Sequence, residues 1–280
     1  MTNVAVVTGG AGGMGLAAAH ALGRDSAVLI CDVDSRRLQA AKRDLREAGV
    51  HCAATACDIT DRSSVAAVVE QAQQLGTVTS VVHTAGVSPS MGSADLIVRV
   101  NVVGTIVINE AFLAIAHPEM GIVNVASVAG HQLPAMLAPM RSYRKFSTDA
   151  NRLQMELVKA CRVVPRARRP HLAYVLSKNF VIWYSKEMAA HFGQRGARVV
   201  SVSPGSFDTS MGRLEANAGA SALVQLGALK RFGQPSEIAE LLRFCASDKA
   251  GYLTGTDIIC DGGVMAAMTF VDMLNLARPR

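Results

Sequence analysis

The chain is poor in aromatic residues and in charge, and both shortages narrow the class of protein. Aromatic residues occupy 5% of the 280 positions, with a single tryptophan, and charged residues occupy 18%. Because hydrophobic residues reach 50%, the chain can bury a full core and is not intrinsically disordered. Its 24 glycines and 9 prolines follow no Gly-X-Y period, which excludes a collagen-like chain.

Signals for membranes, secretion and metals are also missing. No uninterrupted apolar run approaches the ~18 residues of a spanning helix. The start, Met1-Thr2-Asn3, enters an apolar segment without a basic stretch, so we expect no signal peptide. The six cysteines form no Cys-x-x-Cys pair and have no histidine at zinc spacing. We interpret them as reduced small hydrophobic residues and expect a cytoplasmic protein without a metal site.

The net charge of +6 is concentrated in one segment of the chain. Residues 128–173 hold nine basic and two acidic residues, whereas the rest holds 19 basic and 20 acidic residues. A near-neutral domain with one basic segment argues against nucleic-acid binding over a whole face. Three interpretations of the basic side chains stay open: a solvated face, a clamp for an anionic substrate such as an acyl-CoA, or a contact with an acidic membrane surface.

Short apolar runs alternate with helical patterns along the whole chain. We expect strands at residues 4–7, 28–31, 51–56, 78–83, 121–125, 198–202 and 256–260. We expect helices from the first loop to about 24, then over 35–47 with Ser35 as the cap, from 60 or 61 to 75, up to about 117, and over 171–192 and 235–246. This alternation predicts an α/β fold, a doubly wound parallel sheet of the Rossmann type, as one domain over residues 1–280.

The first loop between a strand and a helix is rich in glycine and reads TGGAGGMG over residues 8–15. Glycine lets the backbone approach a pyrophosphate closely, and the following helix offers free N–H groups. Asp32 ends the second strand, where a carboxylate accepts hydrogen bonds from ribose hydroxyls and repels the extra phosphate of NADP. The loop holds no lysine or arginine, and we expect Arg36 and Arg37 on a solvated helix face. The sequence therefore predicts NAD rather than NADP.

Tyr174 and Lys178 are four residues apart and share one face of a predicted helix. An ammonium group near a phenol favours the phenolate and lowers a pKa that starts near ~10. Tyr174 is thus a candidate general base for an alcohol proton. A lone Tyr-x-x-x-Lys pair is common by chance, so the weight comes from the other motifs around it.

The ordered set of motifs resembles the short-chain dehydrogenase/reductase family. The matching positions are Thr8, Gly9, Gly13, Gly15, Asp32, Asp58, Ala85, Gly86, Asn101, Ser127, Tyr174, Lys178, Pro204, Gly205 and Thr209. The resemblance covers nearly the whole chain apart from the segment after Ser127. It implies an enzyme that uses NAD to interconvert a secondary alcohol and a ketone.

The resemblance also implies roles for individual residues. Ser127 would bind the substrate oxygen, Tyr174 would take the proton, Lys178 would hold the nicotinamide ribose, and Asn101 would position a water. Cofactor contacts are implied for Gly9, Gly13, Met14, Gly15, Asp32, Asp58, Ile59, Ala85, Gly86, Tyr174, Lys178, Pro204, Gly205 and Thr209. Helix or strand-end caps remain alternatives for Asp58 and Ser127, and a helix kink or cap for Asn101.

Two stretches depart from the family pattern. The family often has Asn-Asn-Ala-Gly where this chain has His83-Thr84-Ala85-Gly86, and we expect this change to weaken a hydrogen-bond network. Ser127 and Tyr174 are 47 residues apart, because a basic segment over residues 131–170 is inserted before the tyrosine helix. It has apolar residues at steps of three and four, namely Met140, Tyr143, Phe146, Ala150, Leu153, Leu157, Cys161 and Val164.

The inserted segment is either one long helix or a shorter one capped by Thr148 or Asp149. Its apolar stripe is expected to pack on the domain or on a second subunit, beside the active site as a candidate lid. We expect a homo-oligomer, a dimer or a tetramer.

The second variable stretch, residues 206–232, has the composition of an apolar loop that covers the substrate. It favours a hydrophobic substrate such as a ring system or steroid. A non-catalytic NAD-binding regulatory protein and an epimerase or dehydratase on the same scaffold remain alternatives.

Overall fold

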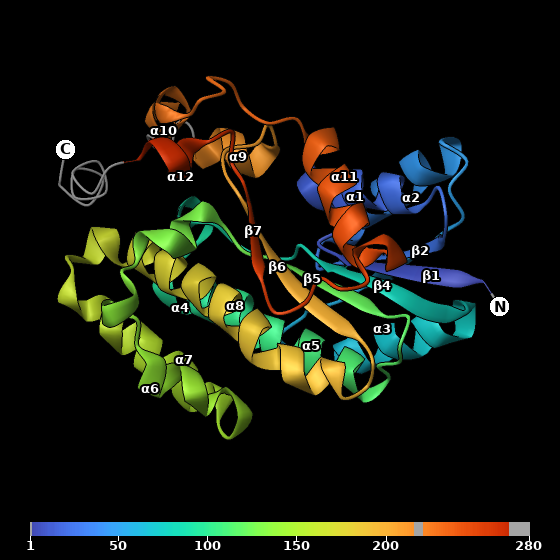
Figure 1. Cartoon of the computed structure of the whole chain (residues 1–280), viewed down its shortest axis with the longest axis horizontal. Coiled ribbons are helices and arrows are strands. Elements are labelled where there is room, and N and C mark those ends of the chain that lie inside the picture. Colours follow the sequence, from blue (N-terminus) through green and yellow to red (C-terminus); the bar gives the residue numbers. More distant parts are fainter. Residues whose placement is uncertain (1, 216–220, 269–280) are drawn as a thin grey trace.

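Seven parallel strands form one sheet in the order β3-β2-β1-β4-β5-β6-β7 (Figure 1). The computed structural model describes residues 2–215 and 221–268. The strands are β1 (Asn3–Thr8), β2 (Ala27–Asp32), β3 (Cys52–Ala56), β4 (Thr77–His83), β5 (Gly121–Val125), β6 (Arg198–Pro204) and β7 (Asp257–Cys260). The strand order runs outward in both directions from β1 and β4, which confirms the predicted doubly wound α/β sheet.

Helices cover both faces of the sheet (Figure 1). One layer contains α1 (Gly13–Leu22), α2 (Ser35–Glu47) and α11 (Pro235–Ala246). The other contains α3 (Arg62–Leu75), α4 (Ala94–Val98), α5 (Gly104–Ala114) and α8 (Arg169–Gly193). Successive residues of β1 therefore enter different cores, with Val4 and Val6 on one side and Ala5 and Val7 on the other. This is why the strands read as continuous apolar runs.

Short helical elements and the helices of the insertion complete the fold. They are η1 (Pro89–Met91), η2 (Arg99–Val103), η3 (Val128–Gln132), η4 (Ala135–Leu137), α6 (Met140–Tyr143), η5 (Arg144–Ser147), α7 (Ala150–Ala160), η6 (Cys161–Val163), η7 (Arg166–Arg168), α9 (Ser210–Glu215), α10 (Ser221–Leu226), η9 (Asp248–Ala250) and α12 (Val264–Ala267). The predicted covering stretch 206–232 thus contains α9 and α10, and its residues 216–220 lie outside the described residues.

Local capping explains where two helices begin. The Asp34 carboxylate accepts hydrogen bonds from the backbone N–H groups of Arg36 and Arg37, so Asp34 caps α2. The expectation of a Ser35 cap was wrong by one residue, because the longer aspartate side chain reaches both amides and Ser35 becomes the first helical residue. Of the two candidates for α3, Asp61 is the cap, since its Oδ1 accepts from the Ser63 N–H.

One helical stretch in the second layer is unusually apolar. Ala94–Ala114 has 21 residues and a mean hydropathy of 1.7, so by length and composition alone it could cross a membrane. Two-thirds of its most apolar window, 67%, is buried inside the protein, and a core helix passes this test as readily as a membrane span. Arg99 and Glu110 interrupt the stretch, which is why no long apolar run was visible in the sequence.

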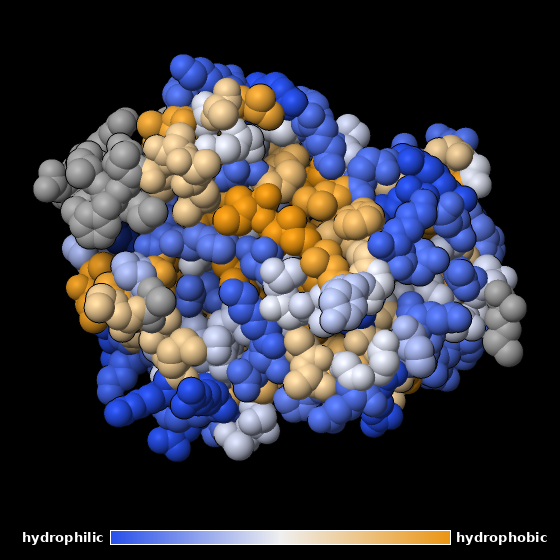
Figure 2. Space-filling view, viewed as in Figure 1, coloured by the Kyte–Doolittle hydropathy of each residue, from blue (hydrophilic) through white to orange (hydrophobic). Residues whose placement is uncertain are grey.

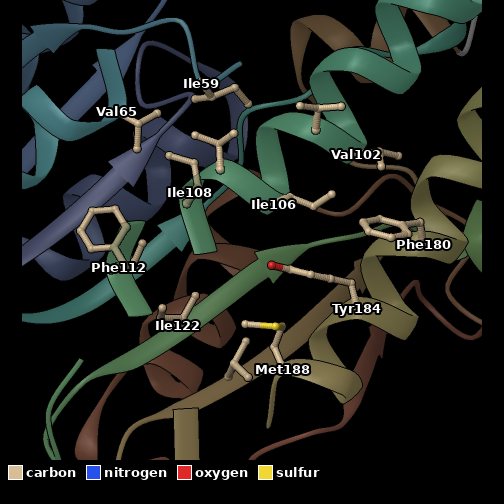
Figure 3. Packing of buried hydrophobic residues seen from close by; sticks show 14 of the residues in the cluster. Ile59, Val65, Val102, Ile106, Ile108, Phe112, Ile122, Phe180, Tyr184 and Met188 are labelled. Atoms are coloured by element: carbon tan, nitrogen blue, oxygen red, sulfur yellow. The ribbon is translucent and has the colours of Figure 1, made fainter. Parts of the chain in front are cut away.

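Figure 3 shows the core that this helical stretch shares with the sheet and α8. Ile106, Ile108 and Phe112 of α5 lie in one cluster with Ile122 of β5, and Phe180 lies on the α8 side. These side chains are fully or almost fully buried. Burial of a residue of this size contributes about 1.5–3 kcal/mol, so this layer is a main source of stability.

The inserted segment folds into two short helices that pack on the same chain. Asp149 caps α7 by accepting a hydrogen bond from the Arg152 N–H at 2.8 Å, so the shorter-helix alternative is right. The stripe residues Leu153 and Leu157 are fully buried and belong to the core on the α8 side. Helix α7 contacts both α4 and α8 (Figure 1). The apolar stripe therefore packs on its own domain.

Aromatic side chains join the insertion to the tyrosine helix. Tyr143 and Phe146 of the insertion contact Trp183 with ring centroids 5.4 and 5.8 Å apart. Tyr143 and Phe180 meet edge to face at 5.2 Å. The Tyr143 hydroxyl also donates to the Leu176 carbonyl oxygen at 2.9 Å. In a chain with few aromatic residues, this concentration fixes the insertion firmly to α8.

Candidate active site

The predicted site residues converge on one edge of the sheet. The glycine-rich loop follows β1, Asp32 ends β2, Ser127 follows β5 and Pro204 ends β6. Strands in a parallel sheet share the edge at which their carboxyl ends lie, and ligands bind outside that edge. The fold therefore brings together positions that are far apart in the sequence.

The glycine-rich loop leaves room that a side chain would fill. Gly9 and Gly13 have φ values of +66° and +54°, a conformation that favours glycine. A Cβ on Gly9 would lie 2.8 Å from the Ala85 nitrogen, and one on Gly15 would clash with the Gly9 carbonyl oxygen. Gly12, at the N-cap of α1, has no side chain to occupy the first helical N–H groups. This cradle fits the diphosphate of a dinucleotide.

Asp32 is hydrogen-bonded into the loop that it faces. Its Oδ2 accepts from the Ala11 N–H at 3.3 Å and its Oδ1 from the Asp34 N–H at 3.1 Å. A carboxylate offers about four acceptor sites, so capacity remains for the hydroxyls of a ribose. These bonds orient the Asp32 side chain at the end of β2, where the sequence predicts that an adenosine ribose binds.

Arg37 lies on α2 and also reaches the glycine-rich loop. Its guanidinium group covers Gly12 so closely that a Cβ on that glycine would clash with it. Arg37 is nevertheless exposed, as expected of a solvated helix face. It reaches the loop because β2 lies beside β1, so that the first turn of α2 flanks the glycine-rich loop. A basic group thus reaches the loop from a different element.

The two residues after β3 behave differently. Asp58 is exposed, and its Oδ1 accepts hydrogen bonds from the backbone N–H and the hydroxyl of Thr60, at 2.9 and 2.8 Å. Asp58 is not a helix cap, since Asp61 has that role. The Ile59 side chain is buried, and a Cβ on Gly104 would lie 2.5 Å from its Cδ1. Any contact of Ile59 with a cofactor is thus left to its backbone.

His83 closes a buried network. Its Nδ1 is 2.7 Å from the Thr8 Oγ1 and its Nε2 is 3.1 Å from the Thr105 Oγ1. The Thr84 hydroxyl donates to the Thr8 carbonyl oxygen at 2.7 Å. We expected the His83-Thr84 pair to weaken the network, but both side chains make replacement bonds. Burial, with the charge of Lys178, lowers the His83 pKa to about 3, so the imidazole is neutral.

Asn101 lies in η2, a π-helical turn between α4 and α5. Its Nδ2 donates to the Val87 carbonyl oxygen and to the Ser177 Oγ, and its Oδ1 accepts from the Val87 N–H, all within 3.1 Å. The Ser177 hydroxyl in turn donates to the Tyr174 carbonyl oxygen at 2.8 Å. Asn101 therefore joins the loop after β4 to α8. Its role in positioning a water stays a prediction.

Tyr174 and Lys178 lie one turn apart on α8. The Lys178 Nζ donates to the Val125 carbonyl oxygen at 2.9 Å and lies 5.8 Å from the centre of the Tyr174 ring. Lys178 is only 7% exposed, and burial lowers its pKa to about 8. The lysine therefore remains mostly protonated at neutral pH and holds α8 against the end of β5.

The Tyr174 phenol is desolvated and contacts Ser127. Burial raises the Tyr174 pKa, and a hydrogen bond with Ser127 acts in the opposite direction. The expectation that Lys178 would leave this pKa lowered was wrong, because desolvation of the phenolate dominates and the ammonium group points to a backbone carbonyl. Ser127 Oγ also accepts from the Ala129 N–H at 3.2 Å, so it caps η3.

The end of β6 and the segment after it hold the last predicted cofactor-binding residues, Pro204, Gly205 and Thr209. The Gly205 N–H donates to the Cys260 carbonyl oxygen at 2.9 Å, and a Cβ on Gly205 would lie 2.8 Å from the Asp261 Cα. Thr209 is buried beside the glycine-rich loop, since a Cβ on Gly13 would lie 3.5 Å from its Cβ. Its Oγ1 accepts from the Gly212 N–H at 2.9 Å. A contact of Thr209 with a nicotinamide carboxamide stays a prediction.

Three residues that shape the site were not predicted as site residues: Ser177, His131 and Glu215. Ser177 lies inside the Tyr-x-x-x-Lys motif and accepts a hydrogen bond from the Asn101 Nδ2. Its hydroxyl group was the only feature of the sequence that pointed to this role. His131 of η3 bonds the Asp257 Oδ2 at 2.8 Å and so ties the segment after Ser127 to β7. Glu215 lies close enough to act on Tyr174, and no local pattern marked it.

The described residues contain no cluster of histidine, cysteine and carboxylate side chains that could hold a metal ion. The six cysteines, all of them described, are free thiols, and only Cys260 is not fully buried. The arrangement therefore offers hydroxyl, phenol, amine and carboxylate groups around a dinucleotide cradle. Such a set can bind a nicotinamide cofactor and move a proton at a substrate oxygen.

Similarity to known proteins agrees with this geometry over almost the whole chain. A family model described as short chain dehydrogenase matches residues 3–141, and one described as Enoyl-(Acyl carrier protein) reductase matches residues 142–265. The short-chain dehydrogenase/reductase bsc3 of Alternaria brassicicola is 31% identical over 278 residues, which covers 96% of this chain and 98% of that protein.

Two further proteins extend the comparison. The 2-(S)-hydroxypropyl-CoM dehydrogenase 3 of Xanthobacter autotrophicus is 30% identical, covering 94% of this chain and 96% of the relative. A solved short-chain dehydrogenase/reductase from Serratia marcescens superimposes with a TM-score of 0.73 at 26% identity, covering 94% of this chain and 97% of that one. The chain belongs to the short-chain dehydrogenase/reductase family, whose members are oxidoreductases that use nicotinamide cofactors.

Proposed function

We propose that the protein is an NAD(H)-dependent oxidoreductase that interconverts a secondary alcohol and a ketone. One observation carries this proposal: Ser127, Tyr174 and Lys178 meet at the sheet edge that also holds the glycine-rich cradle. A relative named as a 2-(S)-hydroxypropyl-CoM dehydrogenase supports a secondary alcohol as the reacting group. Bound NAD would supply the hydride acceptor, which no side chain can replace.

The residues of this chain orient the substrate and handle the proton. Ser127 holds the substrate oxygen next to the Tyr174 hydroxyl. In the reductive direction the phenol donates its proton to the carbonyl oxygen, and in the oxidative direction the phenolate accepts the alcohol proton. Because burial raises the Tyr174 pKa, the phenol prevails at neutral pH. Alcohol oxidation should therefore accelerate as the pH rises toward the Tyr174 pKa, because more of the phenol is then present as the phenolate base.

NAD rather than NADP is the proposed cofactor because of Asp32. Its carboxylate faces the loop where an adenosine ribose would lie, and an added phosphate there would meet like charge. Arg37 is the opposing influence, since its guanidinium group covers Gly12 of the same loop. The expected preference is thus clear but not absolute, and it depends on Asp32.

The proposed substrate has a hydrophobic body. Leu214 of α9, Leu226 of α10 and Leu229 belong to the covering stretch and are more than a third exposed. Exposed leucines on a segment near the catalytic edge support an apolar roof for a ring-shaped or steroid-like molecule. The basic side chains of the insertion favour a solvated face, since Lys145 and Arg152 already pair with Glu156.

Formation of a homo-oligomer, a dimer or a tetramer, is also proposed. Helix α8 is covered on one side by the insertion, so pairing through that side is disfavoured. The alternative surface is the edge strand β7 with α11, where Ile259 and Phe244 are 43% and 46% exposed. Figure 2 shows hydrophobic residues gathered around β7. Light scattering of the wild type and of an Ile259→Lys variant tests this, with a monomeric wild type as the contrary result.

A cytoplasmic location is proposed from the six free thiols, which an oxidising compartment would not preserve. Fractionation of cells of the source organism, with an antibody against the protein, tests this. Recovery in a membrane or secreted fraction would contradict it.

The central experiment measures NADH at 340 nm while purified protein, NAD and a panel of secondary alcohols react. We expect oxidation of hydrophobic secondary alcohols, faster at pH 9 than at pH 7, with weaker use of NADP. Tight NADH binding without any turnover would instead support a regulatory protein. Product formation without net reduction of NAD would support an epimerase or dehydratase.

A further inference from the structure

Glu215 occupies a position that the proposed reaction does not yet explain. It is the last residue of α9, in the variable stretch after β6. Its Oε1 accepts a hydrogen bond from the Ser90 N–H at 3.1 Å, and Ser90 belongs to η1, which follows β4. Helix α9 and η1 also pack together. The carboxylate thus lies between two segments that leave the sheet at its catalytic edge.

The charge of Glu215 acts on two ionisable groups of α8, Tyr174 and His171. It raises the pKa of the Tyr174 phenol, in addition to the larger effect of burial and against the hydrogen bond with Ser127. His171, one turn before Tyr174 on α8, has its pKa lowered by burial, and Glu215 raises it while Arg168 lowers it. Because η1 packs against both α9 and α8, the half-buried Glu215 carboxylate lies close to the part of α8 that holds His171 and Tyr174.

We propose that Glu215 determines substrate specificity by favouring an alcohol that carries a hydrogen-bond donor, an ammonium or hydroxyl group, on the carbon next to the carbinol. A carboxylate, phosphate or sulfonate at that position meets like charge and is rejected. This inference rests on the proposed function and narrows it. It also makes the reacting end of the substrate polar, while the exposed leucines of the covering stretch contact its apolar body.

Glu215 could instead act only as a latch between α9 and η1. The Glu215→Gln variant separates the two roles, because glutamine keeps an oxygen that accepts from the Ser90 N–H but has no charge. A pure latch therefore predicts unchanged selectivity in this variant. Glu187, an exposed glutamate on α8, supplies the matched control through Glu187→Gln.

Four alcohols with one carbon frame test the proposal. 2-Butanol, 1,2-propanediol, 1-amino-2-propanol and 3-hydroxybutyrate share CH3–CH(OH)–CH2–X, where X is methyl, hydroxyl, ammonium or carboxylate. For the wild type at pH 7.5 we expect kcat/KM for the amino alcohol to exceed that for 3-hydroxybutyrate by at least about tenfold. Glu215→Gln should lose most of this ratio, Glu215→Lys should reverse it, and Glu187→Gln should keep it. An equal ratio in wild type and Glu215→Gln overturns the proposal.

Binding to the protein–NADH complex separates this inference from the proposed function, because no alcohol reacts there. Quenching of NADH fluorescence reports the affinity of the same four alcohols. If the charge order appears in binding but no alcohol is oxidised with NAD, the oxidoreductase proposal fails and the role of Glu215 stands. If alcohols are oxidised but neither binding nor kcat/KM follows the charge of X, the role of Glu215 fails alone.

The His171 imidazole gives a third measure that needs no substrate. Glu215 raises its pKa, so Glu215→Gln should lower the pKa of His171 measured by NMR titration of its ring protons. Glu187→Gln should leave it unchanged. An unchanged His171 pKa in Glu215→Gln would show that the carboxylate is not beside α8, which contradicts the geometry of the proposal.

Discussion

The half of the molecule that forms the dinucleotide cradle and the half that carries the inserted helices are built in different ways. The cradle after β1 consists of glycines whose missing side chains make the space, and Asp32 is held there by two backbone N–H groups. The half with the insertion is built from added helices, whose Tyr143 and Leu157 side chains pack against α8 and the core. The first half depends on backbone geometry and the second on side-chain packing.

This difference indicates which part of the chain tolerates substitutions and insertions. The cradle must match a cofactor of constant shape, so a single Cβ on Gly9 or Gly15 would collide with backbone atoms. In the other half, the inserted segment carries its own apolar stripe and packs on α4 and α8, so it is added without disturbing the sheet. The polar link from Asn101 through Ser177 to α8 connects the two halves.

The sharpest test of the junction between the halves is Tyr174→Phe. It removes the proton-transferring hydroxyl and leaves the ring, so we expect kcat to fall by roughly 10²–10⁴-fold. The affinity for NADH, measured by fluorescence titration, should stay within about threefold because the cradle is untouched. Tyr252→Phe, at a fully exposed tyrosine, is the control. A variant that keeps much of its kcat would remove Tyr174 from the chemistry.

Breaking the packing of the inserted helices should lower the free energy of unfolding without changing the cradle. Leu157→Ala removes a fully buried side chain of α7 and should lower the free energy of unfolding in urea by about 2–5 kcal/mol. Met155→Ala on the same helix, 64% exposed, should change it by less than about 0.5 kcal/mol. Equal losses in both variants would mean that the outer face of α7 is covered in solution.

Acid should weaken the cradle side through His83. Its pKa is lowered by burial to about 3, so below pH 6.5 the unfolded chain binds more protons than the folded one and stability falls until about pH 3. At pH 4.5 this contribution is roughly 3 kcal/mol. His83→Asn should flatten the pH dependence of urea unfolding between pH 7.5 and 4.5, whereas His51→Asn, at an exposed position, should not. Parallel curves for wild type and His83→Asn would refute the assignment.

The smallest expected effect concerns cofactor choice within the cradle. Asp32→Ala should reduce the ratio of kcat/KM for NAD over NADP by about tenfold, because a like charge is removed from the phosphate position. Arg37→Ala in that background should abolish the gained use of NADP, since Arg37 covers Gly12. Arg36→Ala is the neighbouring control. A wild type that prefers NADP would overturn the assignment at once.

Some features of the fold and of the site could be predicted from the sequence, and others could not. The strands around Val4, Ile30 and Val123 were predicted to within a few residues, because apolar runs of that length are typical of a sheet buried on both faces. The start of the insertion's main helix was left open between one long helix and a shorter one capped by Thr148 or Asp149, and the structure has the Asp149 cap. Arg37, Glu215 and His131 were missed as site residues, since each acts on a segment distant in sequence.

The alternation of strands and helices, the glycine cradle and the pairing of Tyr174 with Lys178 could all be predicted from residue order, because they depend on periodicity and short spacing. Three other features became visible in the folded chain: burial dominates the pKa of Tyr174, Arg37 lies over Gly12, and Glu215 lies near the carboxyl edge of the sheet. Desolvation and charge interactions depend on distances through space, and the fold sets those distances between residues that the chain keeps far apart.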